Sequence, residues 1–285
     1  MTTVPHQGSA PQTPTRPPRR RPPGALGLGL FRGLGEVRAY ARNRAGLIFN
    51  LALPLALMLL FGTLFKAKAH SGVDPIHDVV VAGVLASGII STALGALAMG
   101  VTLDADDGSL RRLRGTPMPM SAYLIGKVVL SAFLALLESV LVLAAVVFRF
   151  HLPTSASAWL TFVWVFLLGI SAATSLGVGL GLLATNPRSA SGVIQFPLIL
   201  LQFISGVYYS FSGMPKGLQY VGAVFPLKWT AQGMRSALLP ASLAGNEPAG
   251  SWEHGRTAIV LGAWTVGGFL FCMLAQRWRM RRDYR

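Results

Sequence analysis

Residues 123 to 148 read YLIGKVVLSAFLALLESVLVLAAVVF, and Lys127 and Glu138 are the only charged side chains in this run. An α-helix of about 20 predominantly apolar residues is long enough to cross the hydrocarbon layer of a bilayer. The stretch therefore predicts a transmembrane helix.

The rest of the chain has the same character. Of its 285 residues, 52% are hydrophobic and 12% are charged, which is too little charge for an ordinary soluble domain. Five further apolar stretches are long enough to span a bilayer: 46–65, 79–103, 159–184, 189–209 and 257–276. We predict an all-α integral membrane protein with a six-helix transmembrane domain over residues 46–276.

The basic residues are distributed unevenly between the connecting segments. Of the 25 Lys and Arg residues, 18 lie in the two terminal regions and in the second and fourth connections, and 7 lie on the opposite side. Cytoplasmic connections of membrane proteins carry the excess of basic residues. Both the N- and the C-terminus are therefore predicted to be cytoplasmic.

The segments outside the six helices differ in composition. Residues 1–25, rich in Pro and Arg, predict a disordered basic cytoplasmic tail because they cannot bury enough apolar area, and residues 277–285 predict a second basic tail. In residues 26–45, apolar residues recur at helical spacing among four arginines, which predicts an amphipathic interfacial helix. Between Tyr209 and Arg256, Gly and Pro interrupt an apolar segment, which predicts a partly re-entrant element before the last helix.

Several function classes lack support in the sequence. The net charge of +15 does not indicate nucleic acid binding, because the basic residues flank apolar runs instead of gathering on a soluble face. No lysine ends a Gly-x-x-x-x-Gly-Lys-Ser/Thr loop, so the chain is not expected to hydrolyse ATP. The single cysteine, Cys272, lies in an apolar run, and the histidines lack zinc-site spacing. We predict that the chain is not an enzyme and has no catalytic residue, metal or cofactor of its own.

Small residues recur at every fourth position in two of the predicted helices. Such series allow helices in a membrane to approach closely. Packing within one copy of the chain is the favoured interpretation, and a dimer seam is the alternative. The two series are Gly83, Ser87, Ser91 and Gly95, and Gly169, Ala173, Gly177 and Gly181.

The connection after the second predicted helix reads DADDGSLRRLRGTPMP over residues 104–119. Its aspartates precede its arginines, an order that matches the dipole of a short helix, and Pro117 stops that helix. Leu110 and Leu113 would share one face of it. That face could dock on lipid or in a groove of a cytoplasmic partner, whereas a solvated basic loop is the alternative.

This connection and a later motif resemble the membrane subunits of the type-two ABC exporters (ABC-2-type permeases), a class that exports drugs, polysaccharides and lipids. The resemblance runs from about Leu30 to the C-terminus. In that family the connection reads acidic-Gly-Thr-Leu-x-x-Leu and then Pro, and this chain matches it at Asp107, Gly108, Leu110, Leu113 and Pro117, with Ser109 in place of Thr. The late motif is matched by Ser205, Gly206, Pro215, Pro226 and Arg235, whereas Lys228 and Trp229 replace the usual Thr-Tyr.

The resemblance implies a transport function. The coupling helix that contacts a separate ATPase subunit would consist of Asp107, Gly108, Ser109, Leu110, Arg111 and Leu113, with Pro117 after it. That ATPase would bind ATP and Mg²⁺, and a second permease copy or a sister permease would complete the pathway. The expected activity is export of a hydrophobic or amphipathic molecule, such as a drug or lipid, by alternating access across a bacterial plasma membrane.

Glu138 is the only acidic residue deep within a predicted span. A charge there is costly unless it faces a cavity or has a partner, so Glu138 is either a substrate or proton site or a hydrogen-bonded interior carboxyl. Like the late-motif residues, Glu138 is a candidate for the transport pathway or for helix packing. Two alternatives to the exporter stay open: an ion-gradient-driven secondary transporter that uses Glu138, and a non-transporting anchor that binds a cytoplasmic partner through residues 104–119.

Overall fold

The computed structural model describes residues 24–66, 75–116, 118–146, 155–184 and 186–283. Residues 1–23 of the predicted tail, Pro117 and residues 284–285 lie outside this part of the chain. Every regular element within it is helical: α1 (Ala25–Arg42), α2 (Arg44–Lys66), α3 (Pro75–Ile90), the π-helix η1 (Ser91–Ala96), α4 (Leu97–Asp106), α5 (Ser109–Arg114), α6 (Met120–Val146), α7 (Ala156–Leu183), α8 (Pro187–Ile204), the 3-10 helix η2 (Phe211–Gly213), α9 (Lys216–Val224), α10 (Pro226–Leu238), the 3-10 helix η3 (Ala241–Asn246) and α11 (His254–Asp283).

In the described part of the chain, four helical stretches are long and apolar enough to cross a membrane. They are Val79–Asp106, which joins α3, η1 and α4, Met120–Ala145 in α6, Ala156–Leu183 in α7, and His254–Arg279 in α11. These stretches correspond to the second, third, fourth and sixth predicted segments. The prediction of an all-helical, multi-pass membrane protein is confirmed to this extent.

The first and fifth predicted segments have a different form. α1 and the first part of α2 are bent by 90° relative to each other and would make a fifth span only if the pair is counted as one. The apolar part of α8 covers only Ala190–Ile204. The predicted fifth segment extends to about Tyr209, whereas α8 ends at Ile204, because the chain leaves the helix before Gly206, whose φ is +68°. Six spans therefore stay a prediction.

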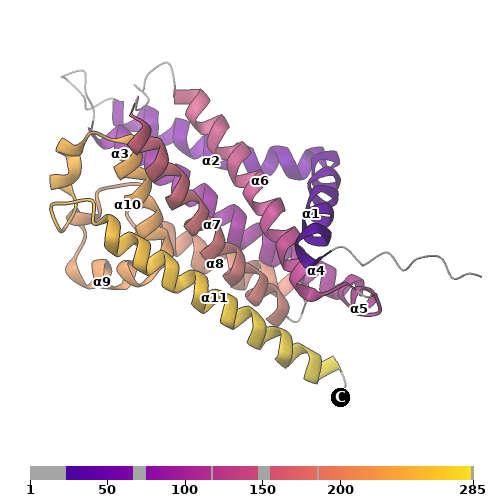
Figure 1. Ribbon diagram of the computed structural model, residues 1–285. Helices are drawn as coiled ribbons and strands as arrows, with labels where there is room; N and C mark the ends of the chain where they lie inside the picture. Colours follow the sequence, from indigo (N-terminus) through magenta and orange to yellow (C-terminus); the bar gives the residue numbers. More distant parts are fainter. Residues whose placement is uncertain (1–23, 67–74, 117, 147–154, 185, 284–285) are drawn as a thin grey trace, which may run out of the picture.

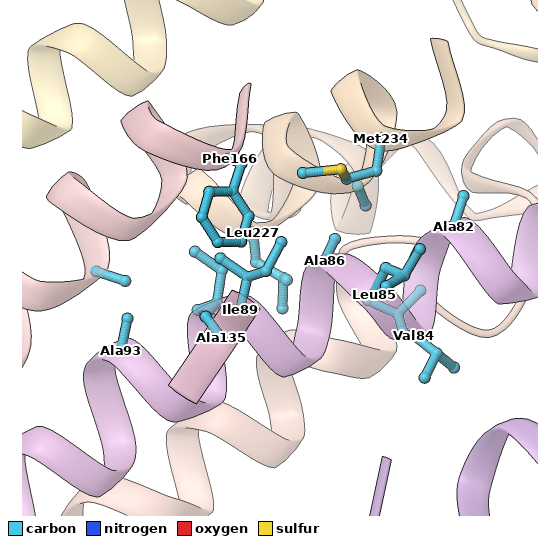
Figure 2. Close-up of a cluster of buried hydrophobic side chains, with 14 of the residues drawn as sticks. Ala82, Val84, Leu85, Ala86, Ile89, Ala93, Ala135, Phe166, Leu227 and Met234 are labelled. Carbon is cyan, nitrogen blue, oxygen red and sulfur yellow. The ribbon is translucent and has the colours of Figure 1, made fainter. Parts of the chain in front are cut away.

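The apolar core lies where the second span meets α7 and α10. In Figure 1, α3 lies near α10 at one end of the bundle, while α11 runs along α7 on one side. Leu85 and Ile89 of α3 are almost fully buried in a cluster with Phe166 of α7 and Leu227 and Met234 of α10 (Figure 2). Because α10 takes part in this core, the segment between α8 and α11 is an integral part of the fold.

Glycines bring α7 into backbone contact with the second span. A Cβ atom on Gly177 would lie 2.6 Å from the carbonyl oxygen of Leu94, and one on Gly181 would lie 2.5 Å from that of Ala98. The hydroxyl of Thr102 uses this proximity to donate to the carbonyl of Gly181 at 3.3 Å. For these two glycines, the prediction of packing within one copy of the chain is confirmed.

Replacing Gly181 with valine is expected to destabilise the protein by about 2 to 3 kcal/mol, because the new side chain would collide with backbone that cannot move independently. The midpoint of thermal unfolding in detergent measures the effect. Gly262→Val in α11 is the matched control, since no other side chain or backbone lies within 4 Å of a Cβ there. Equal unfolding midpoints for the two variants would contradict the tight α7 contact.

The predicted amphipathic helix α1 lies beside α6 (Figure 1). Its contact face is formed by Gly29 and Gly33, at which a Cβ atom would lie 2.6 Å from Ile125 and 2.5 Å from Val129, respectively. The opposite face is apolar and exposed, as a helix bound at a lipid interface requires. The exposed residues of that face are Leu26, Leu30, Phe31 and Leu34.

Candidate functional site

Helix α5 begins after a tight turn at Gly108, whose φ of +76° suits glycine. The carboxylate of Asp107 accepts a hydrogen bond from the backbone N–H of Ser109 at 2.8 Å. Hydrogen bonds from Ser109, and then the nearby charge of Arg112, hold the pKa of Asp107 below its usual value. The short helix predicted within residues 104–119 is thus present and runs from Ser109 to Arg114.

The apolar side of α5 packs against the protein itself. Leu110 is 4% exposed and lies in a cluster with Tyr123, Leu182 and Cys272, and Leu113 is half-buried against the same cluster. Leu110 is therefore covered by the protein itself and does not dock on lipid or on a partner, whereas contact of the partly buried Leu113 with a partner stays a prediction. The ends of α4, α6, α7 and α11 supply the apolar surface that covers them.

The outward side of α5 is charged. Arg111 and Arg112 are exposed, and Arg112 Nη2 donates to the hydroxyl of Ser109 at 3.1 Å. Asp106 and Asp107 are exposed just before the helix. Figure 1 shows α5 at the same end of the bundle as the C-terminal end of α11, and α9 at the other end. This end therefore presents a charged surface of both signs beside the long helices.

A cluster of charged side chains joins three helices next to α5. Lys127 Nζ on α6 lies 3.1 Å from Glu36 on α1 and 2.9 Å from Asp104 on α4. The hydroxyl of Tyr123 donates to Asp104 at 2.9 Å, and Arg32 pairs with Glu36 at 3.1 Å while lying over the Tyr123 ring. These five residues, called the Lys127 cluster below, fasten α1 and the end of α4 to α6.

Sequence reasoning missed the Lys127 cluster. The available signal was a lysine inside an apolar span, which needs an acidic partner or a route to water. The partners could not be chosen from the sequence, because Glu36 and Asp104 lie on separate helices.

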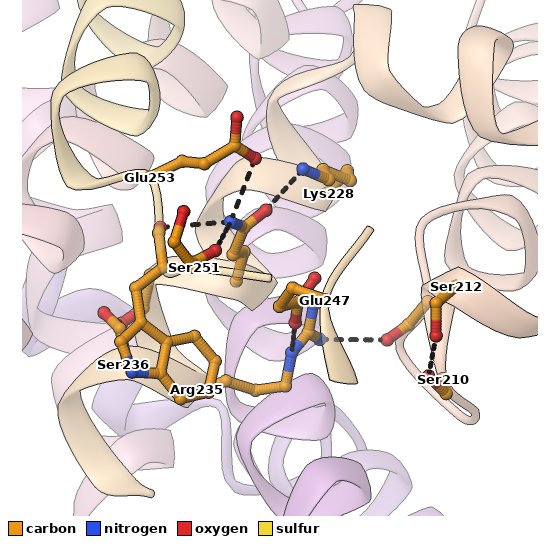
Figure 3. A network of polar contacts seen from close by, with 12 residues as sticks. Ser210, Ser212, Lys228, Arg235, Ser236, Glu247, Ser251 and Glu253 are labelled. Atoms are coloured by element: carbon orange, nitrogen blue, oxygen red, sulfur yellow. Dashed lines mark hydrogen bonds and ion pairs between the residues drawn. The ribbon is translucent and has the colours of Figure 1, made fainter. Parts of the chain in front are cut away.

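Arg235 joins two parts of the late motif. Its side chain is 2% exposed, its Nε lies 2.6 Å from Glu247 Oε1, and its Nη1 donates to the carbonyl of Gly206 at 3.1 Å (Figure 3). Ser205, directly before Gly206, is fully buried. The buried pair thus connects α10 and the segment after η3 to the turn that follows α8.

The two prolines of the late motif have separate places. Pro226 is the first residue of α10, where its missing N–H costs no helical hydrogen bond. Pro215 directly precedes α9 and is exposed. The structure therefore brings Ser205, Gly206 and Arg235 together, while the prolines delimit helices.

Lys228 lies on α10 in a buried polar network. Its Nζ is 3.6 Å from the centre of the Trp229 ring and donates to Gln232. Gln232 Nε2 in turn donates to the carbonyl of Trp252 at 3.0 Å and contacts Glu253 (Figure 3). Burial lowers the pKa of Lys228 to about 8.

We expect the protein to gain stability as the pH rises from about 8 toward 10.5, the ordinary pKa of lysine. In this range the folded state binds fewer protons at Lys228 than the unfolded state does, so stability rises with pH. Thermal unfolding in detergent across this range measures the gain. In Lys228→Met the gain in stability over this pH range should be smaller. The same pH dependence in both proteins would contradict the assignment of the gain to Lys228.

A cavity of about 590 Å³ lies among α2, the second span and α8. Cavities of roughly 300 to 1,000 Å³ hold small molecules in proteins. Apolar residues such as Leu57, Ile199 and Phe203 form part of its wall. The polar side chains of the wall include Asn50, Ser91, Thr92, Gln195, Gln202 and Tyr208.

Glu138 of α6 is 2% exposed and lies directly behind the wall of this cavity, in contact with two of the residues that line it. Its Oε2 accepts a hydrogen bond from Thr92 at 2.9 Å. Its Oε1 has no hydrogen-bond partner in the described part of the chain and lies against Gly88, at which a Cβ atom would be 1.7 Å away. Both Gly88 and Thr92 line the cavity. The structure therefore places Glu138 beside the cavity and apart from the α5 residues and Arg235.

Comparison with protein families identifies the family of the chain. The model of the ABC-2 type transporter family matches residues 34–239, more than half of the chain. The matched region includes α5, the late motif and the cavity-lining residues. No curated protein matches the sequence. On the strength of the family match, the chain belongs to the ABC-2 type transporter family.

Proposed function

We propose that the chain is the permease subunit of an ATP-binding-cassette exporter in a bacterial plasma membrane. Family membership supports a transport role for its helices. A separate ATPase subunit would bind ATP and Mg²⁺ and hydrolyse the nucleotide, since the sequence has no phosphate-binding loop of its own. The chain would not act as an enzyme.

The two-sided character of α5 carries this proposal. Its apolar side is fixed in the protein by Leu110, while Arg111 and Arg112 are exposed at one end of the bundle. A partner that binds this charged face could move α5 and, through the cluster around Leu110, the ends of four long helices. This arrangement suits a helix that transmits movement from an ATPase to the membrane.

The proposed topology has six spans with both termini in the cytoplasm. α2 and α8 would form the first and fifth spans beside the four longer ones. The positive-inside bias of the sequence supports this orientation, as does the position of α5 and the end of α11 at the same end of the bundle (Figure 1). The segment with α9 and α10 would then lie at the external side as a partly re-entrant or interfacial element.

A second permease copy, or a sister permease, would complete the pathway. α8 exposes a row of large apolar side chains next to the cavity: Val193, Phe196, Ile199, Leu200 and Phe203. A second subunit over this face would enclose the cavity between two chains. ATP binding and hydrolysis would then expose the enclosed space to one side of the membrane and afterwards to the other, and the exported substrate would be hydrophobic or amphipathic.

Affinity purification from the native membrane tests the ATPase partnership. We expect an ATPase with a phosphate-binding loop to co-purify with the wild-type chain and to be lost from Arg111→Gln with Arg112→Gln. The matched control is Arg38→Gln with Arg42→Gln, which removes two exposed arginines from α1 and leaves α5 intact. Efflux of the substrate from cells should require ATP hydrolysis by the partner.

The same experiment separates the rival functions. Efflux that persists without the ATPase and stops when the proton gradient collapses would replace the proposal with an ion-driven transporter. A bound partner without any ATP-dependent transport would indicate a membrane anchor.

A further inference from the structure

Among the residues that the structure describes, no cationic side chain pairs with the carboxyl group of Glu138. In the described part of the chain, the only side chain that hydrogen-bonds to it is Thr92. The ion pairs of this part of the chain involve other carboxylates, such as that of Glu36 with Lys127. A buried carboxylate is stabilised by a cation or by a full set of hydrogen-bond donors, and Glu138 has neither.

Gly88 allows the carboxyl group of Glu138 to lie directly behind the cavity wall. A Cβ atom at residue 88 would occupy almost the same space as Glu138 Oε1, at 1.7 Å. Because glycine has no side chain, Oε1 can occupy this space beside a residue that lines the cavity. Thr92, which hydrogen-bonds Glu138 and lines the cavity, belongs to the π-helix η1, so rotation of its side chain would be needed for a ligand to reach the carboxyl group. π-helical turns occur frequently at functional sites.

The cavity wall favours a cation over an anion. Its lining residues within the described ranges include no Lys or Arg, so an anionic group would find no opposite charge among them. Gln195 and Asn50 contribute amide oxygens, and Tyr40, Phe203 and Tyr208 contribute aromatic rings that can attract a cation. The apolar remainder of the wall suits a hydrophobic body.

We propose that this cavity binds an amphipathic organic cation, with its ammonium group at Glu138 and its apolar part against α2 and α8. This rests on the proposed function in so far as the bound molecule is the exported substrate. The binding itself needs neither ATP nor the ATPase. Binding of a cation would supply the counter-charge that the described part of the chain does not provide.

Fluorescence titration of the purified chain in nanodiscs of zwitterionic lipid tests the site. The probe is dansylcadaverine, a primary amine that is cationic at neutral pH, and its N-acetylated form is the neutral comparison of nearly the same shape. We expect the wild-type chain to bind the amine at least about tenfold more tightly than the acetylated form. Glu138→Gln should lower the affinity for the amine by about tenfold or more and leave that for the acetylated form unchanged.

Two further variants separate binding from folding. Glu138→Asp keeps the charge and should keep a preference for the amine, while Gly88→Ala should weaken amine binding because its methyl group displaces the carboxylate. Asp106→Asn, which removes an exposed charge far from the cavity wall, is the control and should bind as the wild type does. Each protein is first checked by gel filtration and thermal unfolding.

The outcomes are distinct. Equal affinity for the two probes, equal amine binding by wild type and Glu138→Gln, or no amine binding by the folded wild type would each overturn the cation site. Amine binding that depends on Glu138 in a chain that recruits no ATPase would retain the site and overturn the exporter function. An ATPase partner in a chain that shows no preference for the amine would retain the exporter function and overturn the cation site.

Discussion

Arg235→Met is expected to destabilise the protein by about 3 to 5 kcal/mol, because it leaves Glu247 buried without its partner. The arginine is 2% exposed and the glutamate 7% exposed. The substitution also removes the donor to the Gly206 carbonyl and thus separates α10 from the turn after α8. Thermal and denaturant unfolding in detergent measure the loss.

Two companion variants identify the cause of that loss. Arg235→Met combined with Glu247→Met should recover much of the stability, since replacing both partners of a buried pair with apolar residues is often nearly neutral. Arg256→Met removes a comparable pair with Glu253 at 3.0 Å, but this arginine side chain is 67% exposed. Its effect should stay below about 1 kcal/mol. A similar loss for Arg235→Met and Arg256→Met would show that burial of the pair is not decisive.

Lys127→Met is expected to cost about 2 to 4 kcal/mol, because Glu36 and Asp104 would face each other without the cation between them. The estimate is below that for Arg235 because the two carboxylate side chains are 17% and 27% exposed. Loss of the ion pairs of Lys127 should also loosen α1 from α6. Limited proteolysis within α1 should therefore become faster, and unfolding in detergent gives the stability.

Tyr123→Phe and Lys127→Arg complete this test. The first removes one hydrogen bond to Asp104 and should cost about 1 kcal/mol, and the second keeps the positive charge and should retain most of the stability. If Lys127→Met leaves both proteolysis of α1 and the unfolding midpoint unchanged, the Lys127 cluster does not hold these helices together.

Local sequence patterns predicted the helices that are determined by residues close together in the sequence. Val79–Asp106 and Met120–Ala145 are apolar over the length of a bilayer, and the short helix α5 has its stop and start signals within a few residues. The same patterns overestimated the length of α8 at its C-terminal end. Apolar character continues through Val207 and Tyr209, but the positive φ of Gly206 turns the chain, and hydropathy carries no information on that turn.

Contacts between distant residues explain the remaining differences. The three-residue spacing of Leu110 and Leu113 predicts a common face but does not tell which surface covers it, and here that surface belongs to the chain itself. The Lys127 cluster depends on how α1 and α4 pack on α6. Glu138 was identified as unusual from its charge alone, whereas its position between Gly88 and Thr92 required the structure.

The π-helix η1 has a consequence for how the length of this chain can vary. A π-helical turn contains about one residue more than an α-helical turn, so it separates two α-helices by one extra residue. Deleting one residue within Ser91–Ala96 would convert the turn to α-helix and leave the facing sides of α3 and α4 in place. The same deletion inside α3 or α4 would rotate part of the span by about 100° relative to its neighbours. A functional sequence one residue shorter in this span should therefore have its gap at η1.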